Sequence, residues 1–182
     1  AKSSPSTSAA TPGSSAASPS VRPLAGCRSL ADLFPEDVYR TVGLYPDSAQ
    51  QRDTVDRSQR SCSFGGVTPD GRKDQRTRVD IVRKAVPGNG ADPDDGLRED
   101  ARQFVGYYCG SEKPYTPTGF QWATACYHAA SDGGFMSVGV ISDDTMVGVE
   151  MTGRRGATGP AQFHHLLEDN ALATATAIRA GL

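Results

Sequence analysis

Two residues in one short segment have the types that nucleophilic catalysis uses. Cys126 and His128 stand two positions apart in FQWATACYHAA, which the sequence predicts to be a strand. Residues i and i+2 of a strand share a face, so the imidazole could act as a base toward the thiol. The chain holds four cysteines, however, and a disulfide role for all of them is the simpler interpretation. We therefore expect Cys126 to be structural.

The cysteines predict a compartment as well as a set of crosslinks. An even number of well-separated cysteines without a CxxC pair favours two disulfides and an oxidising environment over a zinc site. Three pairings are possible, and the sequence alone does not choose among them. Pairing in chain order would join Cys27 to Cys62 and Cys109 to Cys126. Each such crosslink would stabilise the fold by roughly 3–4 kcal/mol in the loop-entropy description.

The remaining ionisable candidates favour structural roles. His164 and His165 are adjacent on a predicted helix, and we expect no partner at i+3 or i+4 to complete a metal pair. The acidic segment 92–95 resembles half of a calcium loop, but Gln103 stands where the loop needs its glutamate. Charge at a helix start explains that segment more simply. Glu150 is predicted at a strand edge or facing solvent.

A glycine-rich basic segment could in principle hold an anion. GRRGATG, residues 153–159, lacks the lysine–serine ending of a phosphate-binding loop and the GxGxxG pattern of a dinucleotide site. A flexible loop between a strand and a helix is therefore the preferred interpretation. The sequence also lacks GxSxG and HExxH signatures, so we predict a non-enzymatic protein with no cofactor and no bound metal. A net charge of −2 gives no basic field for nucleic acid.

The hydropathy pattern predicts an α+β domain: an antiparallel sheet of about five strands with helices packed on one face. The expected order is α-β-β-α-β-β-β-α. One helix is expected over 30–42, with two helices separated near Pro35 as the alternative, and the polar segment 44–60 is expected to be a loop. Five large residues could line an apolar pocket between sheet and helices, although ordinary core is the simpler interpretation of them: Trp122, Phe135, Met136, Met146 and Met151.

The N-terminal segment differs in composition from the rest of the chain. Residues 1–24 are rich in Ser, Ala, Pro and Thr and contain too little apolar surface to fold, so we expect a disordered tether. Residues 25–182 are expected to form a single disulfide-stapled domain. A tether of this length suggests attachment to something else, because it would let the domain reach outward from an anchor.

Three short motifs after the tether carry a family resemblance. They are Cys27-Arg-Ser-Leu30, then Pro35-Glu36-Asp37 with Val42-Gly43, then Cys62-Ser63-Phe64. In this order they resemble the actinobacterial surface lipoproteins of the DUF3558 type, although Phe64 stands where that family has tryptophan. The two pairs of cysteines are also similar to mycobacterial extracellular sensor-type domains with two disulfides.

The resemblance implies a location and, less directly, a role. It implies a secreted lipoprotein of the cell envelope, anchored to the outer face of the plasma membrane by a lipidated cysteine preceding Ala1. We expect a non-enzymatic binding module, most simply an accessory or interaction subunit of a membrane protein complex. The alternative is a carrier or sensor of a small envelope lipid or glycan, held in the apolar pocket.

Overall fold

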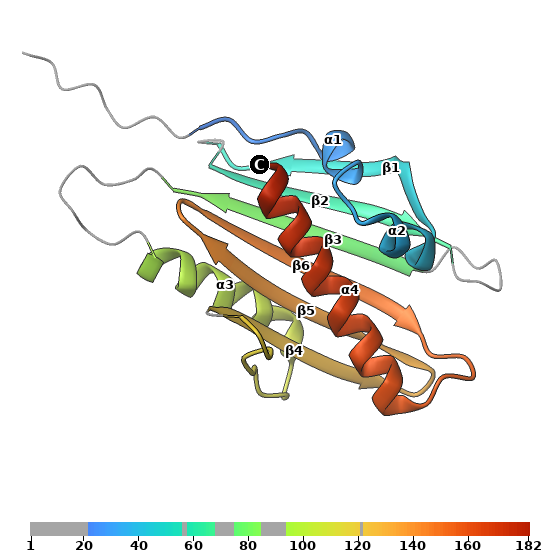
Figure 1. Ribbon diagram of the computed structural model, residues 1–182. Coiled ribbons are helices and arrows are strands. Elements are labelled where there is room, and N and C mark those ends of the chain that lie inside the picture. The colour runs from blue at the N-terminus through green and yellow to red at the C-terminus, as the bar shows by residue number, and fades with distance from the viewer. Residues whose placement is uncertain (1–21, 56–57, 68–74, 85–93, 121) are drawn as a thin grey trace, which may run out of the picture.

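The structure is a computed structural model that describes residues 22–55, 58–67, 75–84, 94–120 and 122–182. Within these residues six strands form one antiparallel sheet, and four helices pack against it (Figure 1). The α+β class is confirmed, with one strand more than expected. Of the predicted tether, residues 1–21 lie outside the described residues.

The sheet consists of two three-stranded meanders joined along their inner strands. The strand order is β1-β2-β3-β6-β5-β4, so β3 pairs with β6 at the centre and all neighbours are antiparallel. Five of these strands match the predicted ones. The bounds are β1 Leu44–Asp53, β2 Gln59–Gly66, β3 Gln75–Arg83, β4 Ala123–Ala130, β5 Gly133–Ser142 and β6 Thr145–Arg154.

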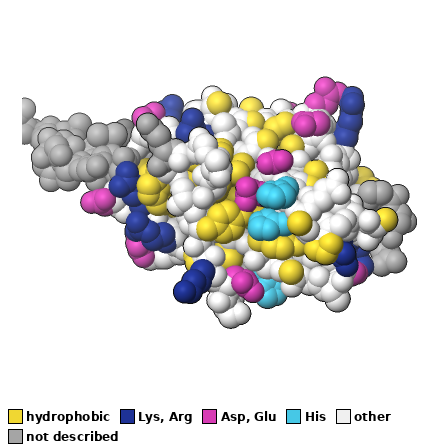
Figure 2. Space-filling model, turned by 60° about the horizontal axis from the view of Figure 1, so that its bottom comes forward, with side chains coloured by type: hydrophobic (Ala, Val, Ile, Leu, Met, Phe, Trp, Pro, Cys, Tyr) yellow, Lys and Arg dark blue, Asp and Glu magenta, His cyan; other side chains and the backbone are white. Residues whose placement is uncertain are grey.

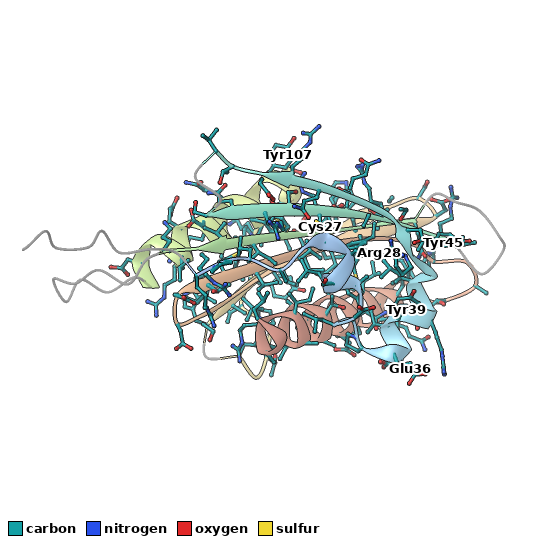
Figure 3. All side chains as sticks on the ribbon, turned by 90° about the horizontal axis from the view of Figure 1, so that it is seen from above. Cys27, Arg28, Glu36, Tyr39, Tyr45 and Tyr107 are labelled. Carbon is teal, nitrogen blue, oxygen red and sulfur yellow. A yellow bond between two sulfur atoms is a disulfide. The ribbon has the colours of Figure 1, made fainter. Side chains whose placement is uncertain are left out.

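Helices cover both faces of the sheet, which corrects the expectation of one covered face. Helices α1 (Cys27–Ala31), α2 (Glu36–Val42) and α4 (Pro160–Gly181) lie on one face, and α3 (Asp94–Cys109) lies on the other. Figure 3 shows Tyr107 of α3 and Tyr39 of α2 on opposite sides of the strands. The prediction of one helix over 30–42 is wrong, and the alternative of two helices separated at Pro35 is what the structure has, because α1 ends before Pro35 and α2 begins after it.

Glycines on the two central strands make the second layer possible. Val138 and Val149 point toward α4, and the alternate positions Gly139 and Gly148 point toward α3. A Cβ atom at Gly139 would lie 2.9 Å from the Cβ of Ala101, and one at Gly148 would meet the ring of Phe104 at 2.7 Å. Because no side chain fits in that space, α3 packs directly on the backbone of the sheet.

The strand that the sequence did not predict is the edge strand β1. Its outer side has no strand partner, and its segment LYPDSAQQRD is mostly polar with no clean alternation. The pairing of β1 with β2 is irregular between Tyr45 and Gln50, and Pro46 lies in that interval. Proline is compatible with an edge strand because it removes a donor that a central strand would need.

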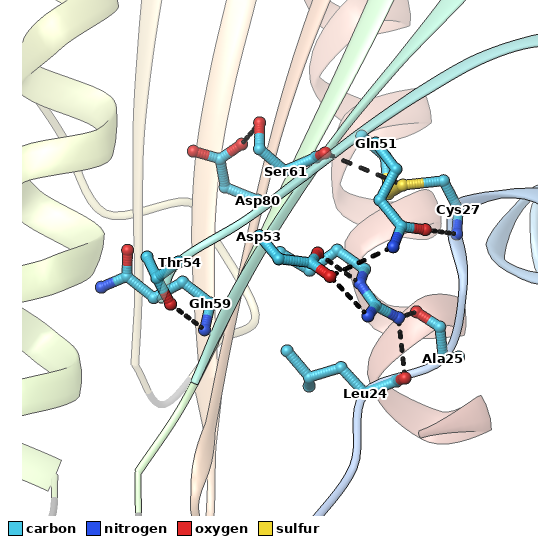
Figure 4. A network of polar contacts seen from close by, with 11 residues as sticks. Leu24, Ala25, Cys27, Gln51, Asp53, Thr54, Gln59, Ser61 and Asp80 are labelled. Carbon is cyan, nitrogen blue, oxygen red and sulfur yellow. Dashed lines mark hydrogen bonds and ion pairs between the residues drawn. A yellow bond between two sulfur atoms is a disulfide. The ribbon is translucent and has the colours of Figure 1, made fainter. Parts of the chain in front are cut away.

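Two arginines attach the start of the described chain to the sheet. Arg60 on β2 donates to the carbonyl oxygen of Leu24 at 2.7 Å and to that of Ala25, and its Nε donates to Asp53 at 2.9 Å (Figure 4). Arg83, only 1% exposed, donates to the carbonyl oxygen of Pro23 at 2.8 Å. Docking of the chain onto the domain therefore begins before residue 25.

Both disulfides join residues in chain order. The Cys27–Cys62 bond ties α1 to β2, and the Cys109–Cys126 bond ties the last residue of α3 to β4. All four cysteines lie in the described part of the chain, and none is free there. Of the three pairings that the sequence allowed, the structure therefore selects the one in chain order.

The lengths of the two closed loops predict different stabilities for two double variants. The bonds close loops of 35 and 17 residues. In the loop-entropy description, C27A/C62A should lower the free energy of unfolding by about 4 kcal/mol and C109A/C126A by about 3 kcal/mol. Denaturant titration of both variants beside the oxidised parent measures this order. A larger loss for C109A/C126A would show that local packing, rather than loop length, decides the contribution.

Candidate functional site

A cavity of about 600 Å³ lies where α4 leaves the sheet, and we call it the α4 cavity. Its walls come from the end of α2, the start of β3, the β4–β5 turn, the connection from β6 to α4, and α4 itself. The volume is in the range of small-molecule sites, about 300–1,000 Å³. The lining residues are Thr41, Val42, Gln75, Ser131, Asp132, Arg154, Arg155, Gly156, Ala157, Thr158, Phe163, Leu166, Leu167 and Asn170.

One side of the α4 cavity is apolar. Phe163 and Leu167 are buried in the core and present their outer surfaces to the cavity together with Val42. Leu166, which helical spacing predicts to be a core residue, is instead 41% exposed and lines the cavity. A leucine left open to solvent beside buried apolar neighbours leaves an apolar wall that a ligand could cover.

The opposite side of the α4 cavity is cationic. Arg154 forms an ion pair with Asp132, and the backbone N–H of Arg155 donates to the carbonyl oxygen of Asp132 at 2.7 Å. Two guanidinium groups and one carboxylate line the cavity, so its lining carries a net charge of +1. The N-terminus of α4, which begins at Pro160, adds the partial positive charge of a helix start.

Residues 154–158 of the glycine-rich basic segment line the cavity and include a turn. Gly156 has a left-handed φ of 55°, which a residue with a side chain rarely adopts. The N–H of Thr158 donates to the carbonyl oxygen of Arg155 at 3.0 Å and closes the turn. The segment is the connection between a strand and a helix that the sequence predicts, and its two arginines line the cavity.

The five residues of the predicted apolar pocket do not meet in one place. Met136 and Met151 belong to the core under α4, whereas Met146 packs with α3 on the other face, beside Trp122. The sheet separates the two groups. Phe135 stacks on His128 at 4.8 Å between ring centroids. Core packing therefore accounts for the three methionines, and the α4 cavity uses different side chains.

The candidate nucleophile is oxidised. Cys126 forms the disulfide with Cys109, so the thiol that His128 would activate does not exist in this state. The acidic segment 92–95 lies largely outside the described residues, and its side chains contribute no described site. Among the residues that the structure describes, no group of three His, Cys, Asp or Glu side chains is placed to hold a metal ion.

One histidine does have an acidic partner that we did not expect. Glu168 stands four residues after His164 on α4, and its Oε2 lies 3.7 Å from His164 Nε2. Tyr115, from the segment between α3 and β4, donates its hydroxyl proton to the same carboxylate. Burial and this hydrogen bond raise the pKa of Tyr115, and burial lowers the pKa of His164. The spacing HHLLE was the signal for Glu168, whereas nothing in the sequence indicated Tyr115.

Comparisons with protein-family models, with curated proteins and with solved structures give no match for this chain. The resemblance to the surface lipoproteins therefore stays a prediction. None of the described helices has the length and the apolar composition needed to cross a bilayer.

Glu150 occupies a central strand and is buried, which corrects its predicted edge or solvent-facing position. The residue is 7% exposed on β6, where Arg78 of β3 and Ser137 of β5 are its cross-strand neighbours. Burial raises the pKa of its carboxyl group, and Arg76 and Arg78 oppose the shift without cancelling it. Burying the charged form of Glu150 therefore lowers the stability of the folded state.

The raised pKa of Glu150 predicts a pH-dependent gain from E150Q. A carboxyl pKa that is higher in the folded state stabilises the protein below the ordinary value of about 4.3, and this contribution is lost as pH rises. E150Q should therefore raise the melting temperature at pH 7, and the gain should shrink as pH falls toward 4. The exposed Glu112, changed to Gln, is the matched control and should show neither effect. A lower melting temperature for E150Q at pH 7 would contradict the burial argument.

Proposed function

We propose that this domain binds a small amphipathic anion, such as a fatty acid or a related acyl lipid, in the α4 cavity. The observation that carries the proposal is the pairing, within one cavity of about 600 Å³, of an apolar wall with a cationic wall. Such a cavity suits a molecule with an apolar tail and a negatively charged head. The proposal keeps the carrier or sensor role that the sequence offers as an alternative, but it assigns the binding site to different residues.

The apolar tail would lie along α4. Phe163, Leu166 and Leu167 offer aromatic and aliphatic surface on successive turns, and Val42 of α2 faces them across the cavity. Covering this wall would remove apolar surface from water at about 25 cal/mol per Å², which is the usual driving force for acyl-chain binding. Ligand binding should remove most apolar surface from water at Leu166, because Leu166 is the most exposed of these side chains.

The anionic head would lie at the turn between β6 and α4. Asp132 already neutralises much of the charge of Arg154, so Arg155 is the main cation toward a ligand. A carboxylate or phosphate there would also meet the N-terminus of α4. Hydrogen bonds between a guanidinium and an anion are among the stronger contacts in proteins, at about 1.5–3 kcal/mol each.

Two disulfides fit an extracytoplasmic location, where acyl lipids and their precursors are at hand. Anchoring by a lipid and the role of accessory subunit in a membrane protein complex stay predictions. They are compatible with ligand binding, since a tethered domain that binds an amphiphile could present it to a membrane partner.

The cationic wall predicts a selective loss for R155Q. Isothermal titration of the full chain with palmitate, below its micelle concentration, should give saturable binding. R155Q should weaken palmitate binding about ten-fold, which corresponds to 1.4 kcal/mol. The same substitution should leave the binding of hexadecanol unchanged, because hexadecanol has the tail without the negative charge.

Two further variants make this test decisive. L166E places a carboxylate in the apolar wall at a half-exposed position, so it should abolish binding of both ligands while the protein still folds. R28Q removes an exposed positive charge on α1 that does not line the cavity, and it should bind palmitate like the parent. Equal losses in R155Q and R28Q would show a general charge effect, and unchanged binding in L166E would exclude the α4 cavity.

A further inference from the structure

Three donor atoms converge beside β4, and none of their three residues lines the α4 cavity. They are the hydroxyl oxygen of Tyr115, Nε2 of His164 and Oε2 of Glu168. Tyr115 Oη lies 3.0 Å from His164 Nε2, and that nitrogen lies 3.7 Å from Glu168 Oε2. Figure 2 shows histidine side chains next to acidic and hydrophobic ones on an accessible part of the surface.

The backbone fixes where these donors stand. His164 and Glu168 are separated by four residues on the 22-residue helix α4, so they lie on one face a single turn apart. Tyr115 comes from a different element, but its segment is pinned to the edge of the sheet. The N–H of Tyr115 donates to the carbonyl oxygen of Ala125 at 2.8 Å, and the N–H of Ala125 returns the bond at 2.8 Å.

Ring packing fixes the orientation of the histidine. The imidazole of His164 stacks on Tyr127 of β4, with centroids 4.2 Å apart and planes 11° from parallel. This stacking fixes the orientation of the His164 ring, so that Nε2 points toward Tyr115 Oη and Glu168 Oε2. Tyr115 Oη has one further neighbour, the sulfur of Met136 at 3.9 Å. The donors are therefore held by contacts that do not depend on a ligand.

The geometry points to a metal site: we propose that Tyr115, His164 and Glu168 bind a divalent transition-metal ion of the zinc class. Zinc binds nitrogen and oxygen donors at about 2.0–2.2 Å, which places two tetrahedral donors about 3.4 Å apart. The separations of 3.0 and 3.7 Å bracket that value, whereas Tyr115 Oη and Glu168 Oε2 are in hydrogen-bond contact and would have to move apart to bind one ion. Two of these residues are common zinc ligands, and the phenol oxygen supplies the third position.

The same atoms without metal form a hydrogen-bonded network, and the two states differ by one proton. Because the single hydroxyl proton of Tyr115 is donated to Glu168, a hydrogen bond between the phenol oxygen and His164 requires the imidazole tautomer protonated at Nε2. On metal binding the phenol proton would leave to solvent, and the imidazole proton would move to Nδ1, freeing Nε2 as a ligand. The charge of the ion would stabilise the phenolate that burial otherwise disfavours.

The site would keep one position open. The side chains of His164 and Glu168 are 33% and 19% exposed, so the ion would be reached from solvent. Three protein ligands with a fourth position left to water is the arrangement of exchangeable and catalytic zinc sites rather than of closed structural ones. The proposal does not rest on amphiphile binding in the α4 cavity, and either can fail alone.

Zinc titration of the full chain, after treatment with a chelator, tests the site. We expect binding of one ion per chain with release of one proton, measured by calorimetry in buffers of different ionisation enthalpy. H164Q and E168Q should each weaken binding by at least ten- to a hundred-fold, since changes even to residues behind metal ligands cost about that much. Y115F should weaken binding and abolish the ultraviolet difference band of tyrosine ionisation.

H165Q is the matched control. His165 is the exposed neighbour on the same helix, its ring 5.8 Å from that of His164, but it contributes no donor to the group. Unchanged affinity in H165Q beside loss in H164Q would support the proposal. Equal losses in both would assign the ion to the surface histidine pair and overturn it, as would the absence of saturable binding. Melting curves without zinc establish that each variant is folded, and E168Q provides a second test if H164Q is not.

Discussion

The direct contact of α3 with the backbone of the central strands is the constraint on which the architecture depends. Gly139 and Gly148 leave no room for a side chain under Ala101 and Phe104. The strands β5 and β6 are therefore covered on both faces, one by α3 and the other by α4. An antiparallel sheet commonly exposes one face to water, but the central strands β5 and β6 of this sheet have helices on both faces.

The two candidate sites both involve α4, which covers one face of these central strands. The α4 cavity opens where α4 departs from β6, beyond the last valines of the core. The Tyr115, His164 and Glu168 group lies beside the edge strand β4, on the same turns of α4 that contribute Phe163 and Leu167 to the cavity. The helix thus supplies side chains to two places of different chemistry. The α4 cavity has an apolar wall with cations, whereas the Tyr115, His164 and Glu168 group is a compact set of donor atoms.

The sequence predicts the elements whose signal is local. Alternating valines and methionines identify β5 and β6, and helical spacing identifies α3 and α4. It does not predict that α3 lies on the second face, because the surface that receives α3 is marked by glycines rather than apolar side chains. It also misses the edge strand β1, and Tyr115, whose partners lie 49 and 53 residues later in the chain. Contacts of that range depend on topology, which a local pattern does not contain.

The Cys27–Cys62 bond has a mechanical consequence for force applied from the N-terminal side of the domain. Tension applied to the chain ahead of Cys27 passes through the sulfur atoms directly into β2. The intervening helices α1 and α2 and the edge strand β1 are thus bypassed, and they cannot be drawn out while the bond is intact. The carbonyl contacts of Arg60 and Arg83 with residues 22–25 would yield first, as a short and reversible extension. The load then falls on β2, which hydrogen bonds on both sides hold within the sheet.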